Sequence, residues 1–109
     1  MANNLTAFFS AISDPTRRAV IEALVAGPAS VSELHAAHDM ALPSFLKHVH
    51  KLEDAGLVRS EKTGRTRVLH IEAAPLAEAE HWISRQRRLW EGRMDRLQAL
   101  VEDMERTRQ

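Results

Sequence analysis

The segment after Pro75 constrains the fold most, because no further proline interrupts it and its apolar residues recur every seven positions. The residues at this spacing are Leu76, Ile83, Trp90, Leu97 and Met104. Such a repeat is typical of a long helix with one apolar face. A helix of about 30 residues is about 45 Å long, which is more than a small domain needs. Part of its apolar face must therefore contact something else, and the simplest candidate is the same helix of a second chain.

The charges are balanced overall but unevenly distributed along the chain. The 109 residues include 15 basic and 15 acidic side chains, and the formal net charge is zero. This balance excludes a protein that binds nucleic acid through its total charge alone. Residues 40–70, however, carry six basic and three acidic side chains, a net charge of +3. The basic middle third is therefore the candidate region for contact with an anionic partner.

The composition indicates a small globular domain. Hydrophobic residues make up 44% of the chain, which is too much for a disordered protein. The absence of cysteine excludes disulfides, thiolate metal sites and cysteine nucleophiles. No apolar run is long enough to span a membrane, and the first residues lack the pattern of a signal peptide. We therefore predict a cytoplasmic protein with no membrane contact, whose small core benefits from dimerisation.

The first third of the chain carries the start and stop signals of three short helices. An apolar stripe at helical spacing comprises Leu5, Phe8, Phe9 and Ile12. Asp14 and Pro15 then suit the N-cap and first position of a second helix, which the pair Gly27-Pro28 ends. Ser30 and Glu33 have the spacing of a capping box and predict the start of a third helix.

A fourth helix is predicted from near Pro43 to Gly56. One of its sides is apolar, with Phe45, Val49 and Leu52. The opposite side carries Ser44, Lys47 and Lys51. A short helix, a tight turn and a second helix with a basic outer side are typical of a helix-turn-helix.

Two β-like runs, residues 57–62 and 65–71, flank Thr63-Gly64 and predict a hairpin. Arg65 and Arg67 make its tip basic. A helix-turn-helix followed by a basic hairpin is a winged helix. We therefore predict a mostly α fold with a small β-hairpin, in which residues 1–74 form a winged helix-turn-helix DNA-binding domain. Residues 75–109 form a long C-terminal dimerisation helix of the same domain.

The run from Asp14 to Ile71 resembles the ArsR-type winged helix-turn-helix transcriptional regulators. The residues that carry the resemblance are 14–18, 31–34, 47–58 and 63–65, in matching order and spacing. The resemblance implies a homodimer that packs through its first and last helices. It also implies binding to an inverted-repeat operator in double-stranded DNA and, usually, repression of transcription.

The sequence departs from the metal sensors of that family. Those proteins place cysteines just after a Glu-Leu pair like Glu33-Leu34, where this chain has His35 and His38. The last helix offers His81 but no second histidine. The chain therefore resembles the metal-independent members, which are often autorepressors, more closely. We expect no metal site and no cofactor, and the inducer, if there is one, is unknown.

The candidate DNA contacts are Ser44, Lys47, His48, Lys51, Thr63, Arg65, Arg67 and Arg17. Those on the fourth helix would enter the major groove, and those on the hairpin would reach phosphates or the minor groove. His48 matches a family histidine and would either contact a phosphate or brace the helix against its own domain. Arg17 lies where a cation opposes the helix dipole, which suggests an anionic partner, either a phosphate or a carboxylate such as Asp14.

The candidate dimer contacts are Leu5, Phe8, Phe9, Ile83, Trp90, Leu97 and Leu100. An aromatic-lined ligand pocket between subunits, formed by Trp82 and Trp90, is the alternative for the last helix.

We predict a sequence-specific DNA-binding regulator that acts as a dimeric repressor. The six histidines and the tryptophan pair leave open a metal- or small-ligand-responsive regulator. The long last helix, with balanced charges, leaves open a protein-interaction module that does not bind DNA. We predict that the protein is not an enzyme. Ser44 and His48 have the spacing of a catalytic pair, but no acid or oxyanion loop is placed beside them.

Overall fold

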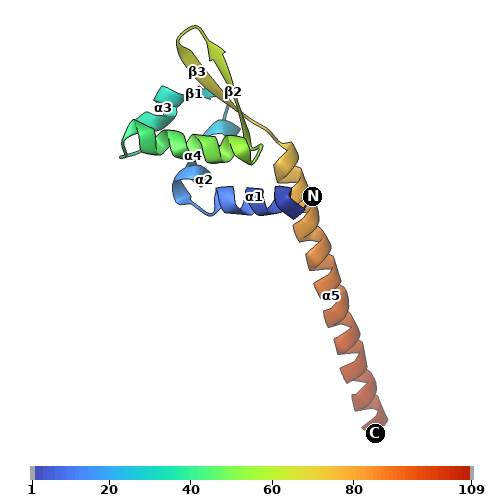
Figure 1. The fold of residues 1–109 in the computed structure, drawn as a ribbon. Coiled ribbons are helices and arrows are strands. Elements are labelled where there is room, and N and C mark those ends of the chain that lie inside the picture. The colour runs from blue at the N-terminus through green and yellow to red at the C-terminus, as the bar shows by residue number, and fades with distance from the viewer. Residues whose placement is uncertain (1, 109) are drawn as a thin grey trace. The chain divides into compact units, whose positions relative to one another are not determined.

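A computed structural model describes residues 2–108, and Figure 1 shows how their helices and strands are arranged. The elements are α1 (Ala2–Ile12), α2 (Pro15–Val25), β1 (Ala29–Ser30), α3 (Val31–Ala36), α4 (Leu42–Asp54), β2 (Val58–Thr63), β3 (Thr66–Ile71) and α5 (Ala74–Arg108). They form two compact units, of which the first ends at Ala79 and the second begins at Glu80. The predicted fold, mostly helical with a small β-hairpin, is confirmed.

The predicted starts of α2 and α3 are confirmed by their caps. The Asp14 carboxylate accepts a hydrogen bond from the backbone N–H of Arg17 at 3.0 Å, and Pro15 is the first residue of α2. The Ser30 hydroxyl accepts from the backbone N–H of Glu33 at 3.1 Å, and the Glu33 carboxylate accepts from that of Ser30 at 3.3 Å. Both halves of the capping box are therefore formed, and these local bonds define where each helix begins.

The sheet contains a strand that the sequence did not predict. Within residues 2–108 the strand order is β1-β3-β2, with antiparallel pairing throughout. Ala29 pairs with Leu69 and Ser30 pairs with Val68. Two residues are too few to show any periodicity, so β1 has no sequence signal of its own. Ser30 thus both pairs in the sheet and caps α3.

The hairpin turn consists of Gly64 and Arg65, because Thr63 pairs with Thr66. Gly64 has a φ of 63°, in the left-handed region that glycine adopts without strain. The hairpin prediction is confirmed, although β2 begins and ends one residue later than expected and β3 begins one residue later. This small shift places Arg65 in the turn itself.

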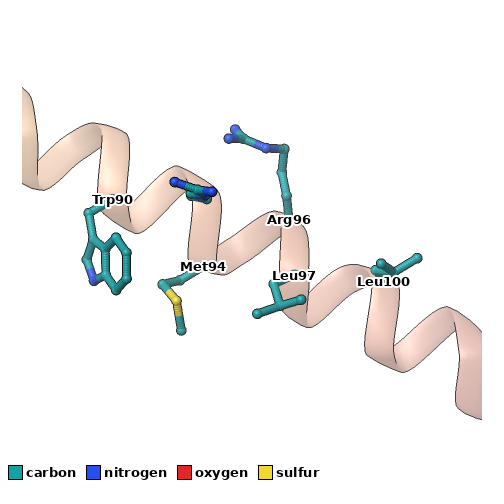
Figure 2. A pocket seen from close by; sticks show the side chains of 6 residues that line it. Trp90, Met94, Arg96, Leu97 and Leu100 are labelled. Atoms are coloured by element: carbon teal, nitrogen blue, oxygen red, sulfur yellow. The ribbon is translucent and has the colours of Figure 1, made fainter.

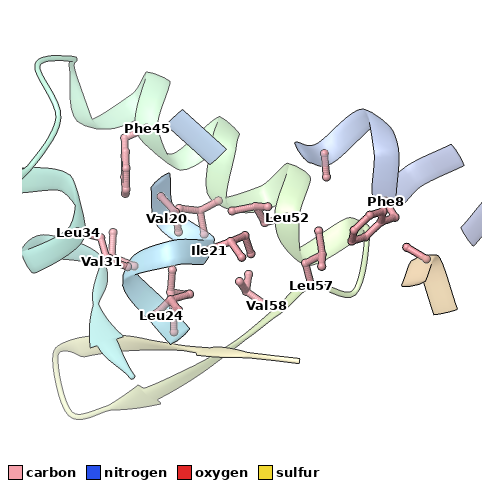
Figure 3. Close-up of a cluster of buried hydrophobic side chains, with 14 residues drawn as sticks. Phe8, Val20, Ile21, Leu24, Val31, Leu34, Phe45, Leu52, Leu57 and Val58 are labelled. Atoms are coloured by element: carbon pink, nitrogen blue, oxygen red, sulfur yellow. The ribbon is translucent and has the colours of Figure 1, made fainter. Parts of the chain in front are cut away.

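The core of the first unit lies between the helices and the sheet (Figure 3). Its largest fully buried side chains are Phe45, Leu24, Leu52, Leu57, Leu69, Val20 and Val49. Phe8 of α1 is only 5% exposed and packs into the same core. Ala79 is buried there too, so α5 begins within this unit. Three of these buried residues come from α4, which anchors its apolar side firmly.

The second unit is the continuation of α5, and the predicted long helix is confirmed. It presents large exposed apolar side chains from Trp82 to Met104. Among residues 2–108, no helix combines the length and the apolar character needed to cross a membrane.

Candidate DNA-binding surface

Helices α3 and α4 are joined by a tight turn that two histidines stabilise. The His35 Nε2 atom lies 2.7 Å from the carbonyl oxygen of Met40. The rings of His35 and His38 lie against Phe45, with centroids 5.4 and 5.6 Å from that of Phe45. In the described part of the chain, no group of three or more His, Cys, Asp or Glu side chains is placed to hold a metal. The two histidines therefore pack within the turn and stabilise its conformation.

Helix α4 is buried on its apolar side and open on its basic side. Phe45, Val49 and Leu52 are completely buried. Ser44, Lys47 and Lys51 are exposed, as the sequence pattern predicted. His50 is exposed as well, and it lies one turn from Lys47. His50 was not among the predicted DNA contacts, although the helical period places it on the outer side of the helix.

His48 lies at the border of these two sides and contacts α2. Its Nδ1 atom is 2.9 Å from the Nη1 atom of Arg17 and 3.7 Å from the Oδ2 atom of Asp14. Of the two roles expected for His48, the bracing contact with its own domain is observed. The phosphate contact stays a prediction.

Arg17 finds its electronegative partners at the C-terminal end of α1. Its Nε atom donates to the carbonyl oxygen of Ala11 at 2.6 Å, and its Nη2 atom donates to that of Ser10 at 3.2 Å. Arg18 donates from Nη1 to the carbonyl oxygen of Ile12 at 2.7 Å. Carbonyl groups at a helix end carry partial negative charge and lack partners in the helix. Backbone carbonyls of α1 thus accept from Arg17, which no local pattern at Arg17 indicates. Contact of Arg17 with a DNA phosphate stays a prediction.

The surroundings of Asp14 shift the pKa of its carboxyl. Burial raises the pKa of its carboxyl, but the hydrogen bond from the backbone N–H of Arg17 lowers it. The nearby charges of His48 and Arg17 and the N–H of Thr16 lower it further. The pKa of Asp14 therefore lies below its ordinary value, and the group is ionised as a cap of α2 at neutral pH.

The hairpin, or wing, carries a basic cluster at its tip. Arg65 lies in the turn, and Lys62 and Arg67 are paired across β2 and β3. Directly opposed residues share one face of a sheet, so these two positive charges lie side by side. Both are exposed, as is Thr63 at the end of β2. Lys62 was not among the predicted contacts, and its charge just before the turn was the signal that was overlooked.

Glu53 connects α4 to the wing. Its Oε1 atom lies 3.8 Å from the Nη2 atom of Arg67, and its Oε2 atom accepts a hydrogen bond from Ser60 at 3.3 Å. The Oε1 atom is buried and has no hydrogen-bond partner among the described residues. Arg67 is therefore paired with a carboxylate of its own domain.

On the opposite face of the wing, acidic side chains pair with the basic ones. Arg59 donates from Nε to Glu72 at 2.9 Å and lies 3.6 Å from Glu61. The His70 Nε2 atom lies 3.1 Å from the Glu61 carboxylate. Because Glu61 and Glu72 offset the positive charge of Arg59 on that face, the basic character of the wing is concentrated at Lys62, Arg65 and Arg67.

This arrangement agrees with the comparisons to known proteins. The family model described as a helix-turn-helix domain matches residues 12–61. A crystal structure of an ArsR family transcriptional regulator has a TM-score of 0.81 and 50% sequence identity, over 84% of this chain and 94% of that one.

Two curated relatives point the same way. The HTH-type transcriptional regulator Rv2034 of Mycobacterium tuberculosis is 35% identical over 69 residues, which are 63% of this chain and 64% of that protein. The transcriptional repressor SdpR of Bacillus subtilis is 25% identical over 75 residues, which are 69% of this chain and 83% of that protein. The chain spans just under two thirds of the first relative. With a helix-turn-helix, a basic wing and these relatives, the chain belongs to the ArsR family of DNA-binding transcriptional regulators.

Proposed function

We propose that this regulator is a cytoplasmic homodimer that represses transcription from an inverted-repeat operator. The single observation that carries the proposal is the exposed basic side of α4, next to a basic wing in the same compact unit. The relative SdpR is named a transcriptional repressor, which supports repression. Two recognition helices of a dimer would enter successive major grooves about 34 Å apart.

The proposed contacts divide by groove. Ser44, Lys47 and Lys51 project toward the major groove, where lysines bond guanine acceptors or phosphates. Thr63, Arg65 and Arg67 contact phosphates or the minor groove from the wing. The structure suggests His50 and Lys62 as additions to this set, since both are exposed beside its members. In this proposal, residues 1–74 contact the DNA and residues 75–109 form the main dimer interface.

The dimer proposal depends on the apolar stripe of α5. Trp90, Leu97 and Leu100 are 61%, 53% and 54% exposed, and Ile83 is also exposed. Trp90, Met94 and Leu97 project from one side of the helix and line a groove with Leu100 and two arginines (Figure 2). Such a long exposed apolar stripe is stabilised when another surface covers it. A second copy of the same stripe is the occupant that the seven-residue spacing favours.

Only part of the apolar stripe of α1 is exposed for contact with a second subunit. Phe9 is 36% exposed and Leu5 is partly buried, whereas Phe8 is used in the core of its own chain. We propose Leu5 and Phe9 as the α1 residues that contact the second subunit. An interface role for Phe8 stays a prediction.

We further propose that the protein regulates without a bound metal or cofactor and has no catalytic activity. The family consists of DNA-binding regulators, which supports the second point. The contacts of His35 and His38 with Met40 and Phe45 support the first, because they give both histidines a structural purpose.

Selection from a random double-stranded DNA library tests the proposal without knowledge of the operator. The expected product is an inverted repeat with half-sites one helical turn apart. The variant Lys47→Ala plus Arg65→Ala should bind the selected DNA at least about tenfold more weakly, because each good contact is worth about 1–3 kcal/mol. Arg88→Ala in the second unit is the control, since it removes an exposed arginine far along α5. Recovery of no preferred sequence, or equal binding by the double variant, contradicts the proposal.

A further inference from the structure

One guanidinium joins three helices beside the proposed recognition helix. Arg17 lies in the first turn of α2 and donates to the carbonyl oxygens of Ser10 and Ala11 at the end of α1. Its remaining nitrogen, Nη1, is 2.9 Å from Nδ1 of His48 on α4. Arg17 is partly buried, and the side chain of His48 is 22% exposed. Three bonds from one planar group therefore define the placement of α4 against α1 and α2.

The contact with Arg17 also determines the tautomer of the neutral histidine ring. A guanidinium has donors and no acceptor, so Nδ1 of His48 must supply the lone pair. The neutral ring then carries its proton on Nε2. Asp14, the other charged side chain recorded against His48, is 3.7 Å from the same Nδ1 atom, which is too long for a hydrogen bond. The Asp14 carboxylate is instead bonded to the backbone N–H of Arg17.

His48 is one turn from both Ser44 and Lys51 along α4. Its ring plane and the rotation of α4 about its own axis are consequently coupled. A shift of this ring would rotate α4 and so change the direction in which Ser44 and Lys51 project. An Nε2–H held in one orientation is in addition a donor that suits a phosphate oxygen.

We propose that Arg17 is a positioning residue for DNA binding, which acts through His48. It holds His48 as an Nε2–H donor and ties the recognition helix to the end of α1. Because α1 carries proposed dimer contacts, the same guanidinium links the dimer interface to the DNA-reading helix. This inference rests on the proposed function, since it assigns Arg17 and His48 roles within the same DNA-binding site.

Two substitutions of His48 separate the acceptor at Nδ1 from the rest of the ring. In His48→Asn the side-chain oxygen can occupy the place of Nδ1 and accept from Arg17. In His48→Gln the longer amide reaches the place of Nε2 and leaves Arg17 without its acceptor. Affinity for the selected operator should fall about tenfold in His48→Gln, which loses the tie to Arg17, and by less in His48→Asn, which loses only the Nε2–H donor. Equal affinities of the Asn and Gln variants overturn the proposal.

Arg18 provides the matched control for Arg17. Both arginines donate to carbonyl groups at the end of α1, but the recorded contact with His48 belongs to Arg17. Arg17→Gln should weaken operator binding about tenfold, and Arg18→Gln should change it by less than about threefold. Equal losses would show that capping of α1, rather than the contact with His48, is responsible.

A measurement without DNA separates failure of this inference from failure of the proposed function. The ¹⁵N chemical shifts of the His48 ring report which nitrogen carries the proton. In the wild-type protein near neutral pH, Nδ1 should be unprotonated and Nε2 protonated, and Arg17→Gln should mix the two tautomers. A proton on Nδ1 in the wild-type protein refutes the inference whether or not the protein binds an operator. A protein with the expected tautomer but no operator binding contradicts the proposed function, and with it the role assigned to Arg17.

Discussion

The Glu53 carboxylate on α4 lies 3.8 Å from the Arg67 guanidinium on β3, and this ion pair joins the recognition helix to the wing. The bond from Ser60 on β2 holds the same carboxylate from the other strand. The two elements proposed to contact DNA are thus connected by one partly buried acidic side chain. Its negative charge would compete with DNA phosphates for Arg67.

Replacement of Glu53 by Gln should therefore tighten DNA binding a few-fold. Gln retains the volume and an acceptor for Ser60, but it releases Arg67 to a phosphate. The plot of log Kd against log salt concentration should steepen by about one unit for each added phosphate contact. Fluorescence anisotropy at several salt concentrations measures both effects, with Glu22→Gln, at an exposed position of α2, as the control. Weaker binding would show that the charge of Glu53 is needed to brace the wing.

Removal of Lys62 should weaken DNA binding without loss of stability. Lys62 and Arg67 are like charges directly across a strand pair, an arrangement that is unfavourable in the free protein. Lys62→Ala should lower operator affinity several-fold while the melting temperature stays equal or rises slightly. Lys62→Arg, which keeps the charge, should bind like the wild type. A lower melting temperature with unchanged affinity would assign Lys62 to the fold instead.

Removal of the Ser30 cap should destabilise the first unit. Ser30→Ala loses the hydroxyl that accepts from the backbone N–H of Glu33, and a lost N-cap costs about 1 kcal/mol, within a range of about 0.5–2 kcal/mol. Urea unfolding followed by circular dichroism measures the change. Ser32→Ala, at an exposed position in the first turn of α3, is the matched control and should change the free energy of unfolding by less than about 0.5 kcal/mol. Equal effects of the two substitutions would contradict the role of the capping box.

A charge in the apolar stripe of α5 should dissociate the proposed dimer. Leu97→Glu places a carboxylate in the middle of the stripe, between Trp90 and Met104. Ala99→Glu adds the same charge about 200° around the helix and is the control. Analytical ultracentrifugation should find the Leu97 variant monomeric and the Ala99 variant dimeric. If both variants remain dimeric, the interface lies elsewhere.

Acid should remove part of the stability through Asp14. Its pKa is lowered in the folded protein, so it stabilises the fold above the ordinary pKa of an aspartate, about 3.9. This stabilisation is lost as the pH falls through the lower folded-state pKa, where the carboxylate takes up its proton. Asp14→Asn keeps an N-cap but cannot titrate. The free energy of unfolding should therefore decrease more steeply below about pH 4 in the wild type than in this variant, and parallel profiles would contradict the prediction.

The local elements of this fold could be predicted because their signals lie within a few residues of one another. The Asp14 cap, the capping box from Ser30 to Glu33 and the turn at Gly64 each satisfy the backbone with a neighbouring group. The helical period likewise showed which side of α4 is buried, and Phe45 and Val49 are indeed completely buried. The strand β1 could not be found in this way, since its two residues depend on pairing with β3.

The sequence by itself thus determined the helices, the basic wing and the exposed basic side of α4. Only the tertiary structure decided the partners of Arg17, because Ser10, Ala11 and His48 come from two other helices. It also decided that Phe8 packs in the core of its own chain and that Glu53 holds Arg67. A period of 3.6 residues tells which side of a helix is apolar, but it does not tell which element will cover that side. That choice is made when the whole core packs, since side chains distant in sequence then compete for the same polar groups.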